Sequence, residues 1–123
     1  MAPANPSKIR FSEFEANLIE RKLYRNGQLV ELQSKGFSFL AALLVHHGEV
    51  VSRTAIAQEL WRGIFVQENQ GLNSAVSKVR RALGDSALEP TYVQTIESQG
   101  YRFIHPVEFV EDDNNARDGS ENS

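Results

Sequence analysis

The spacing of apolar residues changes twice along the chain, and this order restricts the fold more than any other feature of the sequence. Short apolar runs between residues 9 and 32 are typical of β-strands, and Asn26-Gly27 between two of them signals a hairpin. Helical spacing follows over residues 34–83. Two strand-like runs, 92–96 and 101–104, complete the pattern. We therefore predict an α+β fold with two or three N-terminal antiparallel strands, three helices and a C-terminal β-hairpin.

The first two predicted helices are separated by a short turn. The first helix begins at Ser34, and Gly48 follows it in a C-cap position that suits a positive φ. The second begins at Ser52, a good N-cap, and Val51 before it can pack against Ile56. In the first helix, apolar residues recur at i, i+3, i+4, i+7 and i+8, which predicts a buried face of Phe37, Leu40, Ala41, Leu44 and Val45.

The third helix, predicted at about residues 69–83, combines an apolar stripe with a cationic polar face. The stripe consists of Leu72, Val76, Val79 and Leu83, and Gly84-Asp85 ends the helix. Residues 69–84 contain no acid, although the whole chain has a net charge of -3. A helix of this kind fits the major groove of DNA, although a solvated amphipathic helix is an equally good interpretation of this feature alone. The polar face carries Asn73, Ser74, Ser77, Lys78, Arg80 and Arg81.

Several functional classes lack the residues that they require. No apolar run is long enough to span a bilayer, and the absence of cysteine excludes disulfides, thiolate zinc sites and a cysteine nucleophile. The three histidines lack the spacing of a metal site, and neither a catalytic motif nor a phosphate-binding loop is present. We expect no enzyme activity, no cofactor, no metal and no membrane segment in this chain, and a cytoplasmic location.

Six segments carry a family resemblance in fixed order and spacing. They are LQSKGFSFL (32–40), GEVVSRT (48–54), Leu60-Trp61, VSKVRRAL (76–83), Gly84-Asp85 and TIESQGYRF (95–103). Over roughly residues 9–105 the chain resembles the winged helix-turn-helix effector domain of OmpR/PhoB-type response regulators. The passage from residues 72–85 into the GYRF hairpin is most similar to the CadC/ToxR-like branch. The resemblance implies two-component-like signalling and sequence-specific binding of double-stranded DNA by a bacterial transcription regulator.

The resemblance also implies which residues contact DNA, because the third helix of this family enters the major groove. Arg80 follows the stripe directly and could instead pair with an acid such as Glu59. Arg53, at the start of the second helix, could bind a phosphate or form a surface salt bridge. The set facing the groove is Asn73, Ser74, Ser77 and Lys78, with Gln70, Arg80 and Arg81 nearer the phosphates.

The chain departs from the family pattern in two places. At the tip of the predicted wing (residues 92–104), where relatives commonly place an arginine for the minor groove, this chain has Glu97. The wing could then contact the DNA backbone through Ser98, Gln99 and Arg102, or Arg102 could simply shield the sheet. The usual Thr and Glu of a capping box at the first helix are replaced by Gln33 and Gly36, so we expect Ser34 to act as the cap.

We predict a disordered N-terminus at residues 1–8, the winged-helix domain at 9–106 and an acidic disordered tail at 107–123, where six acids face one arginine. The loop from Trp61 to Glu68 is, by resemblance, the place where RNA polymerase is touched, although Trp61 itself is expected in the core. We expect a monomer in solution and a tandem dimer on DNA. The chain could also be a fragment of a longer sensory or membrane-anchored protein. The alternative function is a winged-helix protein-interaction module with reduced or lost DNA affinity.

Overall fold

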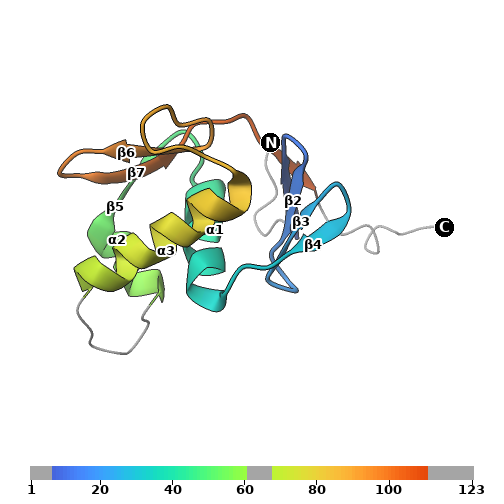
Figure 1. Cartoon of the computed structure of the whole chain (residues 1–123), viewed down its shortest axis with the longest axis horizontal. Coiled ribbons are helices and arrows are strands. Elements are labelled where there is room, and N and C mark those ends of the chain that lie inside the picture. Colours follow the sequence, from blue (N-terminus) through green and yellow to red (C-terminus); the bar gives the residue numbers. More distant parts are fainter. Residues whose placement is uncertain (1–6, 61–67, 111–123) are drawn as a thin grey trace.

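Three helices pack beneath a three-stranded antiparallel sheet and beside a five-stranded antiparallel sheet (Figure 1). The computed structural model describes residues 7–60 and 68–110, with only the backbone of residues 68–70. The first sheet contains β1 (Lys8–Phe11), β2 (Phe14–Asn17), β3 (Lys22–Arg25), β4 (Gln28–Val30) and β8 (Glu108–Val110). The helices are α1 (Ser34–Val45), α2 (Arg53–Leu60) and α3 (Glu68–Leu83), and the second sheet contains β5 (Val50–Ser52), β6 (Val93–Ile96) and β7 (Gly100–Phe103). This is the predicted winged helix-turn-helix architecture.

The N-terminal segment forms four strands rather than two or three. They pair in the order β4-β3-β2-β1, and β8 extends this sheet on the far side of β1. The turn predicted at Asn26-Gly27 joins β3 to β4, with φ values of 51° and 83°. Positive φ at both positions is what a two-residue hairpin requires, and Asn followed by Gly adopts it at low cost.

The expected division of the chain is wrong at both ends of the domain. Residues 108–110, assigned to the disordered tail, form β8, in which Phe109 pairs with Ile9 of β1. Order also begins before residue 9, because Ser7 is buried and its Oγ donates a hydrogen bond to the carbonyl oxygen of Val110 at 3.2 Å. Val107 and Phe109 alternate toward the core, a strand signal hidden by the acidic composition of the segment. The rest of the predicted tail lies outside the described residues.

The buried face of α1 is rotated from the predicted one. Phe37, Leu40 and Leu44 are buried as expected, whereas Val45 is 45% exposed and Ala41 is only partly covered. Phe39 and Leu43 are fully buried instead. The prediction assumed one covering layer, but α1 contacts α2, α3 and β7, so more of its circumference is enclosed.

The N-terminus of α1 also differs from the prediction. Ser34 is the first helical residue and not the cap; the cap position is Gln33, whose side chain makes no capping hydrogen bond. Gly36 is buried there, and a Cβ on it would lie 2.8 Å from Cδ1 of Leu32 and 3.7 Å from Cγ2 of Val79. The glycine therefore allows α3 and the segment before α1 to pack closely at this point. A glutamate at this position would require the Leu32 side chain to move.

The start of α2 and the end of α3 follow the predicted signals. Oγ of Ser52 accepts the backbone N–H of Ala55 at 3.0 Å, so Ser52 caps α2 as predicted. The predicted stripe of α3 is buried, and Gly84 ends the helix with φ at +70°. Strand β5 was not predicted, because its three residues acquire strand geometry only by pairing with β7.

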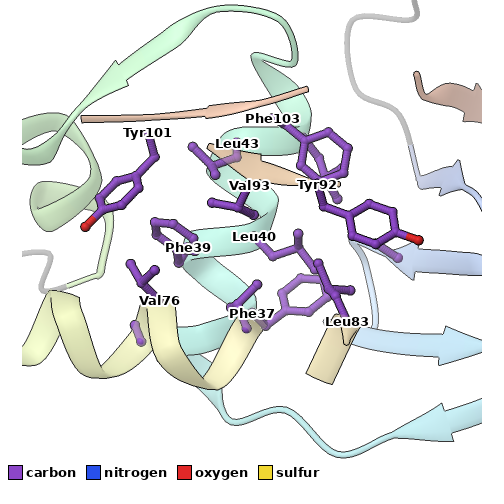
Figure 2. Packing of buried hydrophobic residues seen from close by; sticks show 14 of the residues in the cluster. Phe37, Phe39, Leu40, Leu43, Val76, Leu83, Tyr92, Val93, Tyr101 and Phe103 are labelled. Carbon is purple, nitrogen blue, oxygen red and sulfur yellow. The ribbon is translucent and has the colours of Figure 1, made fainter. Parts of the chain in front are cut away.

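The core packs α3 and the wing against α1. Figure 2 shows α1, α3 and the wing strands converging on one apolar cluster. Because α1 contributes to every part of it, the positions of α3 and the wing are set relative to one another through α1. The labelled members are Phe37, Phe39, Leu40 and Leu43 of α1, Val76 and Leu83 of α3, and Tyr92, Val93, Tyr101 and Phe103 of the wing.

Replacement of Gly100 by alanine is expected to destabilise the wing strongly. A Cβ on Gly100 would overlap the carbonyl oxygen of Val51 and lie 2.9 Å from Cα of Ser52, and both are backbone atoms that cannot rotate away. Separation of β5 from β7 should lower the free energy of unfolding by about 3 kcal/mol. Urea denaturation measures this loss, with Glu97→Ala on the exposed wing turn as the control. Equal midpoints for both variants would contradict the crowding argument.

Candidate nucleic-acid interface

One side of α3 is open to solvent between residues 73 and 81, opposite the buried stripe. The side chains of this exposed face come together as the helical spacing predicts, and no acid lies between residues 69 and 84. The face is formed by Asn73, Ser74, Ser77, Lys78 and Arg81. Gln70 belongs to α3 as well, but its side chain lies outside the described residues. The exposed face of such a helix combines short polar side chains, which let the helix backbone come close to a partner, with long cationic side chains, which reach further from it.

Lys78 and Arg81 are exposed cations on α3. Neither Lys78 nor Arg81 forms an ion pair with a described residue, and Nζ of Lys78 makes a long hydrogen bond of 3.4 Å to Oε1 of Gln33. Together with Glu31, they line a shallow hollow of about 380 Å³ between α3 and the segment before α1. Both cations therefore remain available to an anionic partner.

Arg80 points toward the wing rather than away from the protein. Its Nη2 donates to the carbonyl oxygen of Val93 at 2.9 Å and to Oγ1 of Thr95 at 3.0 Å. Its Nε is buried and has no partner among the described residues. Because Arg80 follows stripe residue Val79, its guanidinium lies toward β6. The sequence offered a pair with Glu59 as an alternative, but the structure shows hydrogen bonds to the wing instead.

Arg53 connects three elements. From the first turn of α2, its Nη1 donates to the hydroxyl of Tyr101 on β7 at 2.8 Å, and its Nη2 donates to Oδ1 of Asn73 on α3 at 3.2 Å. The guanidinium also lies over the Tyr101 ring, 5.7 Å from its centroid. The sequence suggested a phosphate contact or a surface salt bridge, and neither anticipates these bonds.

The tip of the wing is a three-residue turn, one residue shorter than predicted. Glu97, Ser98 and Gln99 are exposed, and Ser98 has φ at +67°. The carbonyl oxygen of Gln99 accepts the backbone N–H of Arg53 at 3.3 Å, which holds the tip near the start of α2. Arg102 donates from Nε and Nη2 to Oε1 of Gln94 on the neighbouring strand, at 3.2 and 2.8 Å.

Asp85 is the residue whose importance the sequence analysis missed. One carboxylate oxygen accepts the backbone N–H groups of Ser86 and Thr91 at 2.9 and 2.7 Å, and the other accepts those of Tyr92 and Val93 at 3.2 and 2.8 Å. Val93 is thus held at its N–H by Asp85 and at its carbonyl by Arg80. The available signal was an aspartate directly after a helix-ending glycine, a residue type that often binds nearby backbone N–H groups.

Other kinds of site find little support in the described part of the chain. No group of three or more His, Asp or Glu side chains there could hold a metal ion. Among the same residues, no helix has the length and apolar character needed to cross a bilayer. The predicted polymerase loop, including Trp61, falls outside the described residues up to residue 67.

Comparison with known sequences shows that this chain is similar to one domain of longer transcriptional regulators. Residues 27–103 match the family described as "Transcriptional regulatory protein, C terminal". The transcriptional regulatory protein CusR of Escherichia coli is 33% identical over 100 residues, which are 81% of this chain and 44% of CusR. The transcriptional regulator HilA of Salmonella typhimurium is 32% identical over 108 residues, which are 88% of this chain and 19% of HilA. This chain therefore spans less than half of these relatives.

Solved structures have the same arrangement of helices and sheets. The DNA-binding domain of Klebsiella pneumoniae RstA, in complex with the RstA box, superposes with a TM-score of 0.69 at 28% identity, covering 79% of this chain and 96% of that one. The DNA-binding domain of Escherichia coli CadC gives a TM-score of 0.70 at 24% identity, covering 85% of this chain and 97% of that one. The CadC likeness concerns the fold alone. The chain belongs to the family of C-terminal domains of transcriptional regulatory proteins, with the OmpR/PhoB-type winged helix-turn-helix fold, as its sequence motifs predicted.

Proposed function

We propose that this chain binds double-stranded DNA sequence-specifically as the DNA-binding domain of a bacterial transcription regulator, with α3 in the major groove. The observation that carries the proposal is the exposed, cationic face of α3, formed by Asn73, Ser74, Ser77, Lys78 and Arg81, which stands opposite a buried stripe. A single helix of this width fits the groove, where base edges are distinguishable. Family membership and the RstA complex with its box support the same function.

The exposed residues divide into two proposed roles. Asn73, Ser74 and Ser77 are short, so they allow the helix backbone to approach the base edges, and Lys78 reaches a guanine edge or a phosphate. Arg81 and Gln70 contact phosphates on either side of the groove. Serving as structural supports, Arg80 and Arg102 use their hydrogen bonds to hold the wing in place.

The wing follows the phosphate backbone instead of entering the minor groove. Glu97 is exposed at its tip, and the negative potential of a narrow minor groove repels a carboxylate. Ser98 and the backbone of the turn are left as the contacting groups. The same exposed carboxylate favours the second candidate function, a winged-helix module that binds protein and has reduced affinity for DNA.

Selection from random duplexes separates these two functions. The full chain is expected to enrich one short motif, because base contacts from α3 add sequence dependence to the phosphate contacts. Sequencing of bound duplexes after several rounds at about 150 mM salt measures the enrichment. Binding that shows no motif and disappears with modest salt would instead favour the protein-interaction module.

Assembly and partners follow from the proposed function. Few phosphate contacts are available to a single copy, so we propose that a monomer in solution binds tandem half-sites as a pair. We further propose that the chain acts in the cytoplasm, that residues 61–68 contact RNA polymerase and that the domain is part of a longer regulator.

A further inference from the structure

We propose that Arg53 is a specificity-positioning residue, which turns the side-chain amide of Asn73 so that its NH₂ group faces the DNA base. The inference rests on the proposed function, since it concerns how α3 distinguishes bases. Arg53 acts through Asn73 and need not touch a base itself. Arg53 thereby determines whether the oxygen or the NH₂ group of the Asn73 amide faces the major groove.

The orientation of the Asn73 amide follows from the chemistry of its partner. A guanidinium has donors and no acceptor, so the Asn73 atom that lies 3.2 Å from Nη2 of Arg53 must be the carbonyl oxygen. This removes the usual ambiguity between the oxygen and nitrogen ends of an amide. The NH₂ group therefore points away from Arg53, and Asn73 is exposed on the same face as Ser77, one turn further along α3.

Arg53 is itself held in place. Its side chain is half-buried, and Nη1 donates to the hydroxyl of Tyr101, which is 4% exposed. The Tyr101 ring packs edge-on against Phe39 of α1, with centroids 5.3 Å apart and an interplanar angle of 83°. The core therefore supports Tyr101, Tyr101 supports Arg53, and Arg53 supports the amide. A base-reading group needs this kind of second layer to keep one orientation.

The orientation of the Asn73 amide predicts which DNA base this side chain contacts. An asparagine that reads adenine uses its oxygen and its NH₂ together, on N6 and N7. The oxygen of Asn73 lies beside a cation, which repels the donor groups of adenine N6 and cytosine N4. The outward NH₂ suits acceptors, and guanine offers two of them, N7 and O6, at its major-groove edge. We expect guanine at the position that Asn73 reads.

The test measures base preference at one position. The position is defined in the selected motif as the one whose preference disappears in Asn73→Ala. Binding of the full chain is then measured to four duplexes that differ only there. The wild type should favour guanine by about tenfold. Arg53→Gln should reduce this ratio to about twofold while preferences at other positions are retained, and Asn73→Asp, which keeps an acceptor for Arg53, should shift the preference to cytosine.

Tyr101→Phe and a distant arginine complete the design. Tyr101→Phe keeps the ring packing but removes the hydroxyl that holds Arg53, so it should give an intermediate ratio and serves where Arg53→Gln does not fold. Arg25→Gln on β3 removes an exposed cation paired with Glu13 and should leave the ratio at about tenfold. Folding of each variant is checked by circular dichroism.

Each outcome has a distinct meaning. Arg53→Gln that weakens all four duplexes equally, or leaves the ratio unchanged, overturns the inference while the proposed function stands. A wild-type preference for adenine at this position also overturns it. Failure of the wild type to enrich any motif overturns the proposed function and the inference together.

Discussion

Simultaneous replacement of Lys78 and Arg81 by alanine is expected to weaken binding to a selected duplex about a hundredfold, or roughly 3 kcal/mol. Both cations are exposed on the α3 face and unpaired with any described acid, so their full charge is available to the DNA. Each lost phosphate contact should also reduce the number of counterions released on binding, by up to about two in total, and so flatten the plot of log affinity against log salt concentration. Fluorescence anisotropy over a salt series measures both quantities.

The control for this experiment removes one positive charge from a distant position. Lys22 is exposed on β3 in the N-terminal sheet, on a different element from the proposed interface. Lys22→Ala should change affinity by less than about threefold, since a distant charge contributes only a screened long-range term. If the Lys78 and Arg81 double variant retains wild-type affinity and salt slope, α3 is not the DNA-binding helix.

Asp85→Ala is expected to lower the free energy of unfolding by about 3 kcal/mol. The carboxylate accepts four backbone N–H groups, and those of Tyr92 and Val93 would remain buried without an acceptor. Urea denaturation followed by circular dichroism measures the loss. Binding should weaken as well, because the segment between α3 and the wing loses its fixed shape.

Two variants make the Asp85 result specific. Ser86→Ala removes an exposed hydroxyl that accepts the N–H groups of Leu88 and Glu89 at 3.2 and 3.3 Å, and should cost less than about 1 kcal/mol. Asp85→Asn keeps one acceptor oxygen but turns an NH₂ group toward the remaining donors, so it should lie close to Asp85→Ala. Stability equal to wild type in Asp85→Ala would mean that water satisfies these N–H groups.

Features that depend on local periodicity could be predicted from the sequence. The stripe of α3 follows from helical spacing, the Ser52 cap and the Asn26-Gly27 turn follow from contacts within a few residues, and the structure confirms all three. The exposed face of α3 follows from the same spacing, so its polar side chains were identified together. Their contacts with DNA stay a prediction.

Features that depend on distant partners could not be predicted. Strand β8 is formed by pairing with β1, about a hundred residues earlier in the chain, and β5 is formed by pairing with β7. Arg80 and Arg53 have the composition of surface cations, yet each is bound by residues of the wing that no local pattern connects to them. The sequence shows that a side chain is charged, and the fold determines where the charge points.

The double attachment of Val93 has a mechanical consequence. Both polar groups of its backbone are held by residues at the end of α3, so this helix and the first wing strand cannot tilt independently. A helix and a strand joined in this way bind a partner as one rigid unit. Because their relative orientation is fixed before binding, association costs less conformational entropy. Side chains on the outer surface of this unit can then differ between relatives. Such changes alter the preferred target while the relative orientation of α3 and β6 stays the same.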